Sequence, residues 1–172
     1  MARFPLRRLR LRPGEEHREA VHLAIEPFAL GGQEYTSSSE EIPAELVVQR
    51  ASTGDVFRLR FDARVEGPCM RCLAPAAAVL EVDAREYQAT DPGADDELRS
   101  DYVVDGELDL DTWARDLVGL GLPAQILCRP DCAGLCPVCG KDLNVEPHEH
   151  DGEAVDPRWA ALEALRADLP SE

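Results

Sequence analysis

Hydrophobic and polar residues alternate along the segment from Val56 to Glu66, without a break from Phe57 onward. Every second side chain is apolar, beginning at Phe57 and ending at Val65, and the side chains between them are mostly charged. A period of two places one face of a strand against a core and the other face in water. A strand with one wet face is typical of an antiparallel sheet, because parallel sheets are covered on both faces. The polar face is made of Arg58, Arg60, Asp62, Arg64 and Glu66.

Shorter stretches with the same alternation lie on both sides of this strand. Residues 46–48 and 78–84 are predicted to be its neighbours, and residues 21–25 form a further alternating stretch that stops before Pro27. Turns rich in Gly, Ser and Asp, or containing Gly and Pro, separate the strands as hairpins require. The first half of the chain is therefore predicted to form a sheet.

Two helices are predicted in the second half. Asp109 or Asp111 is a suitable N-cap for a helix over about 111–122, where apolar residues recur at helical spacing. A last helix is predicted to begin at Asp156-Pro157, because Asp is favoured at the N-cap and Pro at the first helical position. Strands first and helices last define an α+β class, with mainly antiparallel β-sheet or a small open barrel.

The chain is strongly acidic, with 34 Asp and Glu residues against 18 Lys and Arg and a net charge of −16. Broad nucleic-acid interfaces depend on Lys and Arg that displace counterions from phosphates. The composition therefore argues against DNA as a partner and favours a basic protein, with any RNA contact confined to a local patch. No apolar run approaches the ~20 residues of a membrane span, and no secretory signal pattern is present. We expect a cytoplasmic protein with no membrane partner.

Two segments depart from the average charge. Residues 1–13 contain five Arg and no acid, which fits either a basic arm for RNA or an edge strand with its arginines in water. Residues 91–111 contain nine acids and one Arg. This run is interpreted either as a solvated loop or as a docking surface for a cationic partner, centred on Asp95, Asp96 and Glu97.

Six cysteines carry the clearest chemistry in the sequence. They form a Cys-x2-Cys pair, a Cys-x3-Cys pair and a second Cys-x2-Cys pair, a spacing that in a cytosolic protein indicates metal ligands more than disulfides. Cys136-Pro-Val-Cys139-Gly140 is the strongest signal, because Pro fixes the turn and Gly permits the positive φ after the second ligand. Thiolate-rich tetrahedral sites favour zinc. The pairs are Cys69 with Cys72, Cys128 with Cys132, and Cys136 with Cys139.

Six cysteines exceed one tetrahedral site, so the number of ions is open. His148 and His150 follow Cys139 closely and bring the candidates to eight, enough for two sites of four. One partition joins the first four cysteines, Cys69 to Cys132, and separately joins Cys136 and Cys139 to the two histidines. A second partition forms one zinc ribbon from the two Cys-x2-Cys pairs, and a third forms a local site from the four cysteines between 128 and 139. One or two structural zinc ions are therefore predicted.

These sites look closed, whereas a catalytic zinc keeps a position open for water. No P-loop, nucleotide-binding glycine motif, nucleophile elbow or paired-carboxylate arrangement is recognisable. We therefore do not expect an enzyme. The predicted organisation is a sheet core over 1–126, with an acidic loop at about 91–111 and a helix at 111–122. Residues 127–172 follow as a Cys/His zinc-binding segment whose C-terminal helix packs on the core.

Several of these motifs together resemble the YceD family, the large ribosomal RNA subunit accumulation proteins. The resemblance is carried by Gly-Pro-Cys-Met-Arg-Cys-Leu at 67–73, the Cys-rich run at 128–144, and Asp-Pro-Arg-Trp-Ala-Ala-Leu at 156–162. It implies a part in the accumulation of 23S ribosomal RNA. Some family members have Cys-x-Cys where this chain has His148 and His150, which favours two metal sites.

The leading hypothesis is a non-enzymatic, zinc-stabilised factor for ribosome assembly that binds a basic ribosomal protein or maturation factor. An alternative is direct contact with precursor 23S rRNA through arginines. Another is a thiol redox sensor or redox-gated chaperone, in which Arg71 favours the thiolates of Cys69 and Cys72. A processing enzyme ranks last. The arginines of the RNA hypothesis are Arg7, Arg8, Arg10, Arg58, Arg60, Arg64 and Arg71.

Overall fold

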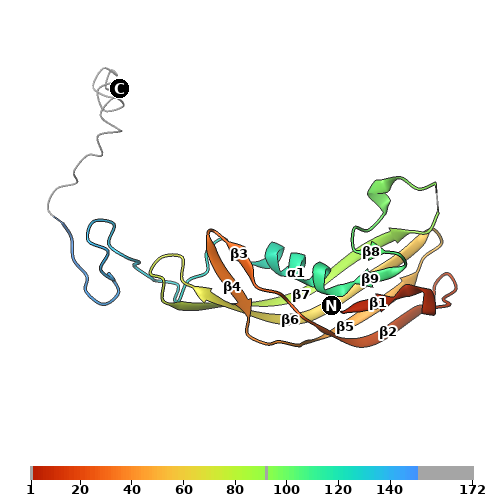
Figure 1. Cartoon of the computed structure of the whole chain (residues 1–172), viewed down its shortest axis with the longest axis horizontal. Helices are drawn as coiled ribbons and strands as arrows, with labels where there is room; N and C mark the ends of the chain where they lie inside the picture. Colours follow the sequence, from red (N-terminus) through yellow and green to blue (C-terminus); the bar gives the residue numbers. More distant parts are fainter. Residues whose placement is uncertain (1, 92, 151–172) are drawn as a thin grey trace, which may run out of the picture. The chain divides into compact units, whose positions relative to one another are not determined.

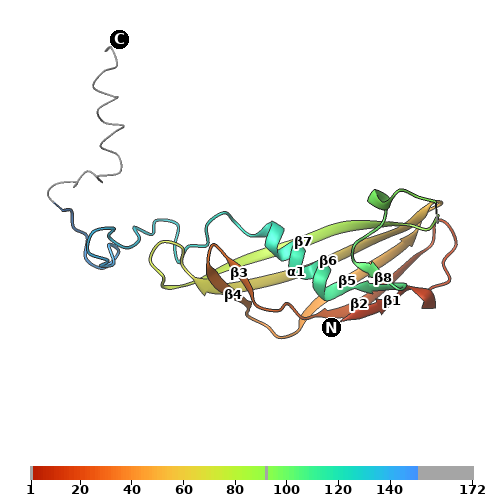
Figure 2. The ribbon, with the colours of Figure 1, turned by 45° about the horizontal axis from the view of Figure 1, so that its top comes forward.

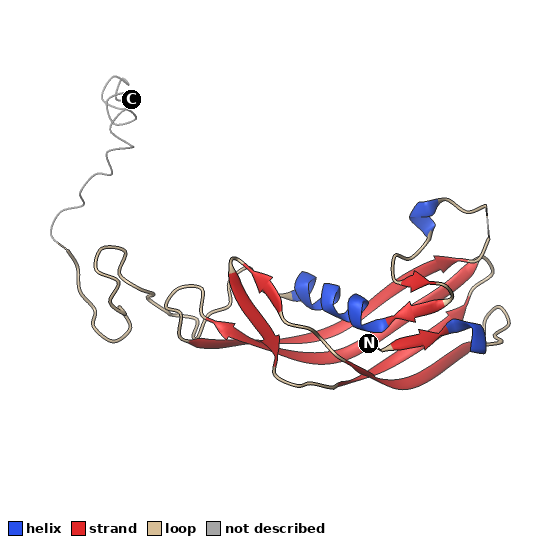
Figure 3. Cartoon of the chain, in the orientation of Figure 1, coloured by secondary structure: helices blue, strands red, loops and turns tan. Residues whose placement is uncertain are grey.

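The computed structural model describes residues 2–91 and 93–150. The chain divides into two compact units, Met1–Cys132 and Ala133–Glu172. The first unit is a sheet with one helix, and the described part of the second is a loop structure (Figures 1 and 3). The helix predicted after Asp156 lies outside the described residues, and the domain boundary expected after residue 126 stays a prediction.

The first unit is built on an open antiparallel sheet of six strands. A continuous path runs β2-β5-β6-β4-β3, and β7 pairs with β6. Figure 2 shows the long strands side by side, with α1 crossing one face. The strands are β2 (Glu16–Leu23), β3 (Phe28–Leu30), β4 (Gln33–Ser37), β5 (Ile42–Arg50), β6 (Gly54–Pro68) and β7 (Pro75–Ala89).

Strand β6 is the centre of this sheet and confirms the alternation in the sequence. Phe57, Leu59 and Val65 are fully buried, whereas the charged residues between them lie on the other face. One edge of β6 pairs with β7 along its whole length, from Gly54 opposite Ala89 to Pro68 opposite Pro75. The other edge pairs with β5 and, near its end, with β4. The prediction of an antiparallel sheet is confirmed, and the sheet is open.

Helix α1 (Leu110–Gly121) covers the apolar face of the sheet. Its N-cap is Asp109, whose side chain accepts a hydrogen bond from the Thr112 backbone N–H at 3.1 Å. Trp113 and Val118 are almost fully buried. Asp111 is also buried and accepts from the Ala24 backbone N–H at 2.8 Å. Of the two candidate caps, Asp109 therefore caps the helix, and Asp111 fastens it to the chain before β3.

Three segments differ from the sequence predictions. The basic N-terminal stretch is a strand only over β1 (Arg3–Pro5), which is followed by the 3-10 turn η1 (Leu6–Arg8). The acidic run is not one loop: after the 3-10 turn η2 (Asp96–Leu98) it forms β8 (Val103–Val104) and β9 (Glu107–Asp109), and β9 pairs with β1 in a small sheet. The β3–β4 hairpin was not predicted, although Gly31-Gly32 is a recognised hairpin turn.

Candidate metal centres

The first group of candidate ligands gathers at the tip of the β6–β7 hairpin. Cys69 and Cys72 lie in the turn between these strands, and Cys128 and Cys132 come from the segment after α1. The four sulfurs lie within 4.8 Å of one another. Cys69 Sγ is 3.8 Å from Cys132 Sγ, and Cys72 Sγ is 3.6 Å from Cys128 Sγ. We refer to these four residues as the sheet cluster.

The second group lies within a local loop structure of the second unit. It consists of Cys136, Cys139, His148 and His150, whose ligand atoms also lie within 4.8 Å of one another. Nε2 of His148 is 3.1 Å from Sγ of Cys139. We refer to these four residues as the loop cluster. The grouping of all eight side chains is that of the two-site partition, and neither the single ribbon nor the local four-cysteine site matches it.

The two Cys-x2-Cys turns share one backbone scheme. The N–H of Cys69 donates to the carbonyl of Ala74 at 2.7 Å, and the N–H of Leu73 donates back to the carbonyl of Cys69 at 3.0 Å. In the loop cluster, Cys136 donates to Lys141 at 2.8 Å and Gly140 donates to Cys136 at 2.9 Å. The residue after the second cysteine has a positive φ in both turns, 63° at Leu73 and 72° at Gly140. Only the second turn has a glycine where this conformation favours one.

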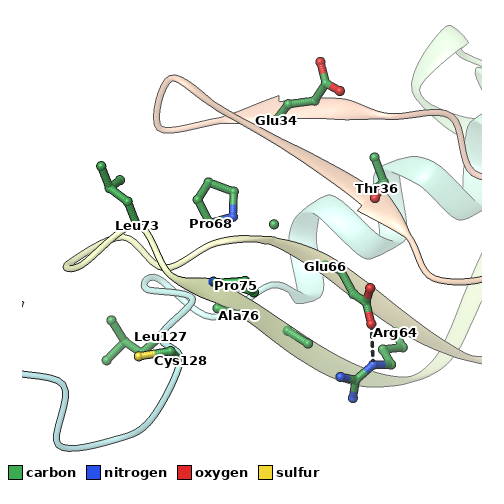
Figure 4. Close-up of a pocket in the computed structure, with 12 residues that line it drawn as sticks. Glu34, Thr36, Arg64, Glu66, Pro68, Leu73, Pro75, Ala76, Leu127 and Cys128 are labelled. Carbon is green, nitrogen blue, oxygen red and sulfur yellow. Dashed lines mark hydrogen bonds and ion pairs between the residues drawn. The ribbon is translucent and has the colours of Figure 1, made fainter.

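Leu73 was not singled out from the sequence. Aligning the two Cys-x2-Cys turns would have shown a leucine where the other turn has glycine. Its side chain is 56% exposed and lines a groove of about 700 Å³ beside the sheet cluster. Figure 4 shows Leu73 and Pro68 on the hairpin, with Leu127 and Cys128 on the neighbouring segment. Cys128 is thus the sheet-cluster ligand that borders this groove.

Arg71 ties together the two halves of the sheet cluster. Its guanidinium donates to the carbonyl oxygen of Cys132 at 3.0 Å and to Oε1 of Gln125 at 3.2 Å. The Met70 N–H adds a backbone hydrogen bond to the Ile126 carbonyl at 2.9 Å. These bonds hold the segment that carries Cys128 and Cys132 against the hairpin. Arg71 thereby acts as a positioning residue for the cysteines.

Backbone amides favour the thiolate form of one cysteine in each cluster. Burial disfavours the thiolate of Cys69, but hydrogen bonds from the backbone of Arg71, Cys72 and Cys128 outweigh it and lower its pKa to about 6. In the loop cluster, the backbone N–H groups of Cys139 and Val138 lower the pKa of Cys136 to about 6. Metal binding requires deprotonated thiols. In each turn, the backbone therefore favours the deprotonated form of one cysteine, which is the form that binds a metal.

Short hydrogen bonds within the second unit position the histidine ligand. Nδ1 of His148 lies 2.8 Å from the carbonyl oxygen of Glu146, and since a carbonyl only accepts, Nδ1 carries the proton. Nε2, which faces Sγ of Cys139, then carries no proton and can bind a metal, as in many zinc sites with an outer hydrogen-bond partner. The same bond raises the pKa of His148. The loop itself is closed by hydrogen bonds from Leu143 to Gly134 and from Ala133 to the side chain of Asn144.

The donor sets and distances fit four-coordinate zinc. A tetrahedral ion with Zn–S bonds of about 2.3 Å has sulfurs about 3.8 Å apart, close to the 3.8 and 3.6 Å observed in the sheet cluster. These separations are far beyond a disulfide bond of about 2.05 Å, and all six cysteines are free. Four sulfurs in one group, and two sulfurs with two imidazoles in the other, are common structural zinc sets. The two groups can each hold one metal ion.

Most arginines of the RNA hypothesis are engaged with protein acceptors. The guanidinium of Arg58 makes a two-pronged contact with Asp83, which also attracts Arg60 at 3.5 Å, and Arg64 contacts Glu66 at 2.8 Å. The Arg58 hydrogen bond lowers the pKa of Asp83. Arg7 and Arg8 lie in η1 and are exposed, as is Arg10 beyond it. The described structure therefore leaves the N-terminal arginines better placed for a phosphate than those of β6.

The acidic candidates lie at the opposite end of the sheet from the hairpin tip. Asp95, Asp96 and Glu97 are exposed in and before η2, beyond the end of β7. The Ser100 N–H donates to the side chain of Gln88 in β7 at 3.0 Å and anchors this loop to the sheet. Within the first unit, the structure therefore does not bring these acidic residues together with the sheet cluster.

An open antiparallel sheet with one helix, followed by a loop structure, defines a small and mainly β protein. It carries two groups of Cys and His side chains that could each hold a metal ion. The family model described as large ribosomal RNA subunit accumulation protein YceD matches residues 57–166, which is more than half of the chain. The chain therefore belongs to the YceD family.

Three relatives illustrate this membership. An uncharacterized protein of Mycobacterium tuberculosis is 42% identical over 123 residues, which cover 69% of this chain and 58% of the relative. The uncharacterized protein YlbN of Bacillus subtilis is 32% identical over 116 residues, 63% of this chain and 66% of its own length. A Zea mays protein, large ribosomal RNA subunit accumulation protein YCED homolog 1, chloroplastic, is 38% identical over 42 residues, 24% of this chain and 14% of its own.

The chain spans less than three-fifths of the length of the mycobacterial relative. No solved structure matches the chain. Within the part of the chain that the structure describes, no helix has the length and apolar character needed to cross a membrane.

Proposed function

We propose that this protein is a non-enzymatic, zinc-stabilised factor that supports the accumulation of large-subunit ribosomal RNA in the cytoplasm. The family description and the name of the maize relative support a role connected with ribosomal RNA. The observation that carries the zinc assignment is the convergence of eight Cys and His side chains into two groups of four. Four protein ligands leave no position for a reacting water, so both ions act on structure.

The proposed partner is a basic ribosomal protein or maturation factor. Its docking surface is the exposed acidic loop around Asp95, Asp96 and Glu97. Opposite charges steer such encounters, and their effect fades with salt over a Debye length of about 8 Å at physiological ionic strength. The protein would then act on ribosomal RNA indirectly, by holding a basic partner until assembly.

A complementation experiment tests this function. A bacterial strain that lacks its own family member would receive either the parent chain or one of two triple variants. The docking variant carries Asp95→Asn, Asp96→Asn and Glu97→Gln. The control neutralises three exposed acids elsewhere, Glu26→Gln, Glu40→Gln and Glu41→Gln. The ratio of 23S to 16S rRNA should be restored by the parent and the control and remain low with the docking variant. Equal rescue by both variants would show that the acidic loop is not the docking surface that the function requires.

The N-terminal arginines support a second candidate, direct RNA binding, because they are exposed and lie outside the ion pairs of β6. A gel-shift assay with 23S rRNA fragments compares the parent with a triple variant, Arg7→Ala, Arg8→Ala and Arg10→Ala. A loss of shift in the triple variant would favour direct contact. An unchanged shift, or none with either protein, would leave the basic protein partner as the preferred explanation.

A further inference from the structure

Strand β7 forms a long open border of the main sheet. It is fifteen residues long and pairs on one side with β6. Among the described residues, no strand pairs with its other side, and Figure 2 shows β7 at the margin of the sheet. An edge of this length presents unpaired backbone groups that can accept another strand.

Hydrogen bonds beyond both ends of the β6–β7 pair show which residues face the open side. The Cys69 N–H bonds the carbonyl of Ala74 at the hairpin tip, and the Thr90 N–H bonds the carbonyl of Thr53 at the other end. In an antiparallel ladder the bonding residues alternate, so the even-numbered residues of β7 bond β6. The odd-numbered residues direct their N–H and C=O groups outward. These include Ala77, Val79, Glu81, Asp83 and Arg85.

The first half of this edge is apolar and borders a groove. Residues 75–80 carry no charge, and the side chain of Val79 is 68% exposed. Residues 77–80, together with the segment after α1, line a groove of about 530 Å³. Apolar residues from both sides contribute, including Leu80, Pro123 and Leu127. Charges and prolines commonly protect natural edge strands, and between Pro75 and Glu81 this edge has no such protection.

The second half of the edge is acidic and continues toward the acidic loop. Glu81 and Glu86 outnumber the single Arg85, while the third acid, Asp83, is paired with Arg58 of β6. η2, with its exposed acids, packs beside the end of β7, and Ser100 fastens this loop to Gln88. An occupant of the whole edge would therefore meet an apolar groove at one end and negative charge at the other.

We propose that the open edge of β7 receives an extended segment of a basic protein partner as an added antiparallel strand. Its apolar part lies along Ala77–Leu80, and its basic part runs from Glu81 toward the acidic loop. This inference rests on the proposed function, because it gives the mode of binding for the same partner. A second copy of the chain fits less well as the added strand. If the β7 strands of two copies paired antiparallel over their whole length, Glu81 of one copy would lie opposite Asp83 of the other. Like charges directly opposite each other destabilise such a pair.

A synthetic peptide of about twelve residues serves as the probe, with Lys and Val alternating in its first half and Thr and Val in its second. The metal-loaded full chain is titrated with this peptide, and amide hydrogen exchange is followed by NMR. We expect binding that weakens with salt and added protection of the outward amides of Ala77, Val79 and Glu81. An acidic peptide with Glu in place of Lys, and a Lys peptide with N-methylated alternate amides, should each bind at least about tenfold more weakly.

The matched variants are Val79→Pro and Val79→Thr. Proline is tolerated on an edge strand where the N–H faces outward, but it removes the donor that an added strand requires. Val79→Pro should weaken binding about tenfold or more, whereas Val79→Thr keeps the backbone donor and should stay within about threefold. If Val79→Pro does not fold, the hydrogen-exchange measurement on the parent chain still tests whether the peptide binds along β7.

Four results would overturn the proposal: no binding of the Lys peptide, protection confined to the acidic loop, equal affinity of both variants, or self-association of the chain through β7. The rRNA complementation described above separates this failure from that of the function. Restored 23S rRNA without peptide binding at β7 would leave the function in place and discard only the strand-addition mode.

Discussion

The two Cys-x2-Cys turns have the same backbone hydrogen bonds but lie in very different surroundings. In the sheet cluster, Cys69 and Cys132 are almost fully buried, and the ligands come from segments about sixty residues apart. In the loop cluster, the four ligands fall within fifteen residues and Cys139 is exposed. The same local motif thus joins distant parts of a fold in one case and shapes a short loop in the other. We expect the metal to contribute to global stability only in the first case.

The largest effect is expected when the sheet cluster is removed. Cys69→Ser with Cys132→Ser should abolish one metal site and leave the segment after α1 without its attachment to the hairpin. Structural zinc contributes on the order of 10 kcal/mol to small domains. In this larger fold, we expect a loss of about 5 kcal/mol or more, and therefore a Tm lower by roughly 10–20 °C. Calorimetry of the metal-loaded variant measures this change.

Removal of the loop cluster should have a local effect. Cys136→Ser with Cys139→Ser should abolish the other site and the hydrogen-exchange protection of residues 133–150. Because no ligand of this cluster comes from the sheet unit, the Tm of that unit should change by less than about 2 °C. A Tm loss equal to that of the sheet-cluster variant would show that the two units are stabilised together. It would contradict the expectation that only the sheet cluster contributes to global stability.

Arg71 offers an intermediate test, confined to the sheet cluster. Arg71→Ala removes the bonds to Cys132 and Gln125. Outer partners of metal ligands commonly affect metal affinity by 10–100-fold, so we expect about a tenfold faster transfer of zinc to a chelator from this site alone. The control is Arg64→Ala, which removes an exposed arginine paired with Glu66 and should leave zinc transfer unchanged. Equal transfer rates in the two variants would argue that Arg71 has no positioning role.

The smallest expected effect concerns the residue that follows the second cysteine in each turn. Leu73 has a positive φ, which costs a non-glycine residue about 1–2 kcal/mol. Leu73→Gly should therefore raise the free energy of unfolding by about 1 kcal/mol. The reciprocal change, Gly140→Leu, should weaken zinc retention in the loop cluster. Urea titration and chelator competition measure the two effects, and a destabilised Leu73→Gly variant would show that packing outweighs the strained backbone.

Local patterns account for much of what could be predicted. The alternation around Phe57 predicted the central strand and the antiparallel class, because a half-buried sheet imposes a period of two. The stretches at 46–48 and 78–84 predicted its neighbours, which are β5 and β7. Asp109 was one of two candidate caps, and the hydrogen bonds of the structure distinguish them: Asp109 accepts from Thr112 within the helix, and Asp111 from Ala24 outside it. The β3–β4 hairpin was not predicted because its strands are short. The β8–β9 hairpin was not predicted because its few apolar residues lie in a run that is mostly acidic, which is typical of a loop.

The partition of the candidate ligands could not be derived from spacing alone. Cys72 and Cys128 are 56 residues apart in the chain and meet only because β6 and β7 place the hairpin tip beside the segment after α1. The ion pair of Arg58 with Asp83 likewise depends on the register between β6 and β7, whereas Arg64 pairs with Glu66 within its own strand. Spacing identifies which residue types can bind a metal, whereas the topology of the sheet decides which of them share one.

The central claim is that two separate four-ligand sites hold zinc. It is tested most directly by measuring the zinc content of the purified full chain together with zinc X-ray absorption, on the parent chain and on the variant with Cys136→Ser and Cys139→Ser. The account predicts two zinc ions per chain with an average of three sulfurs and one nitrogen. In the variant, one zinc ion should remain, bound by four sulfurs. A single zinc in the parent chain, or a remaining ion with imidazole ligands in the variant, would contradict the account.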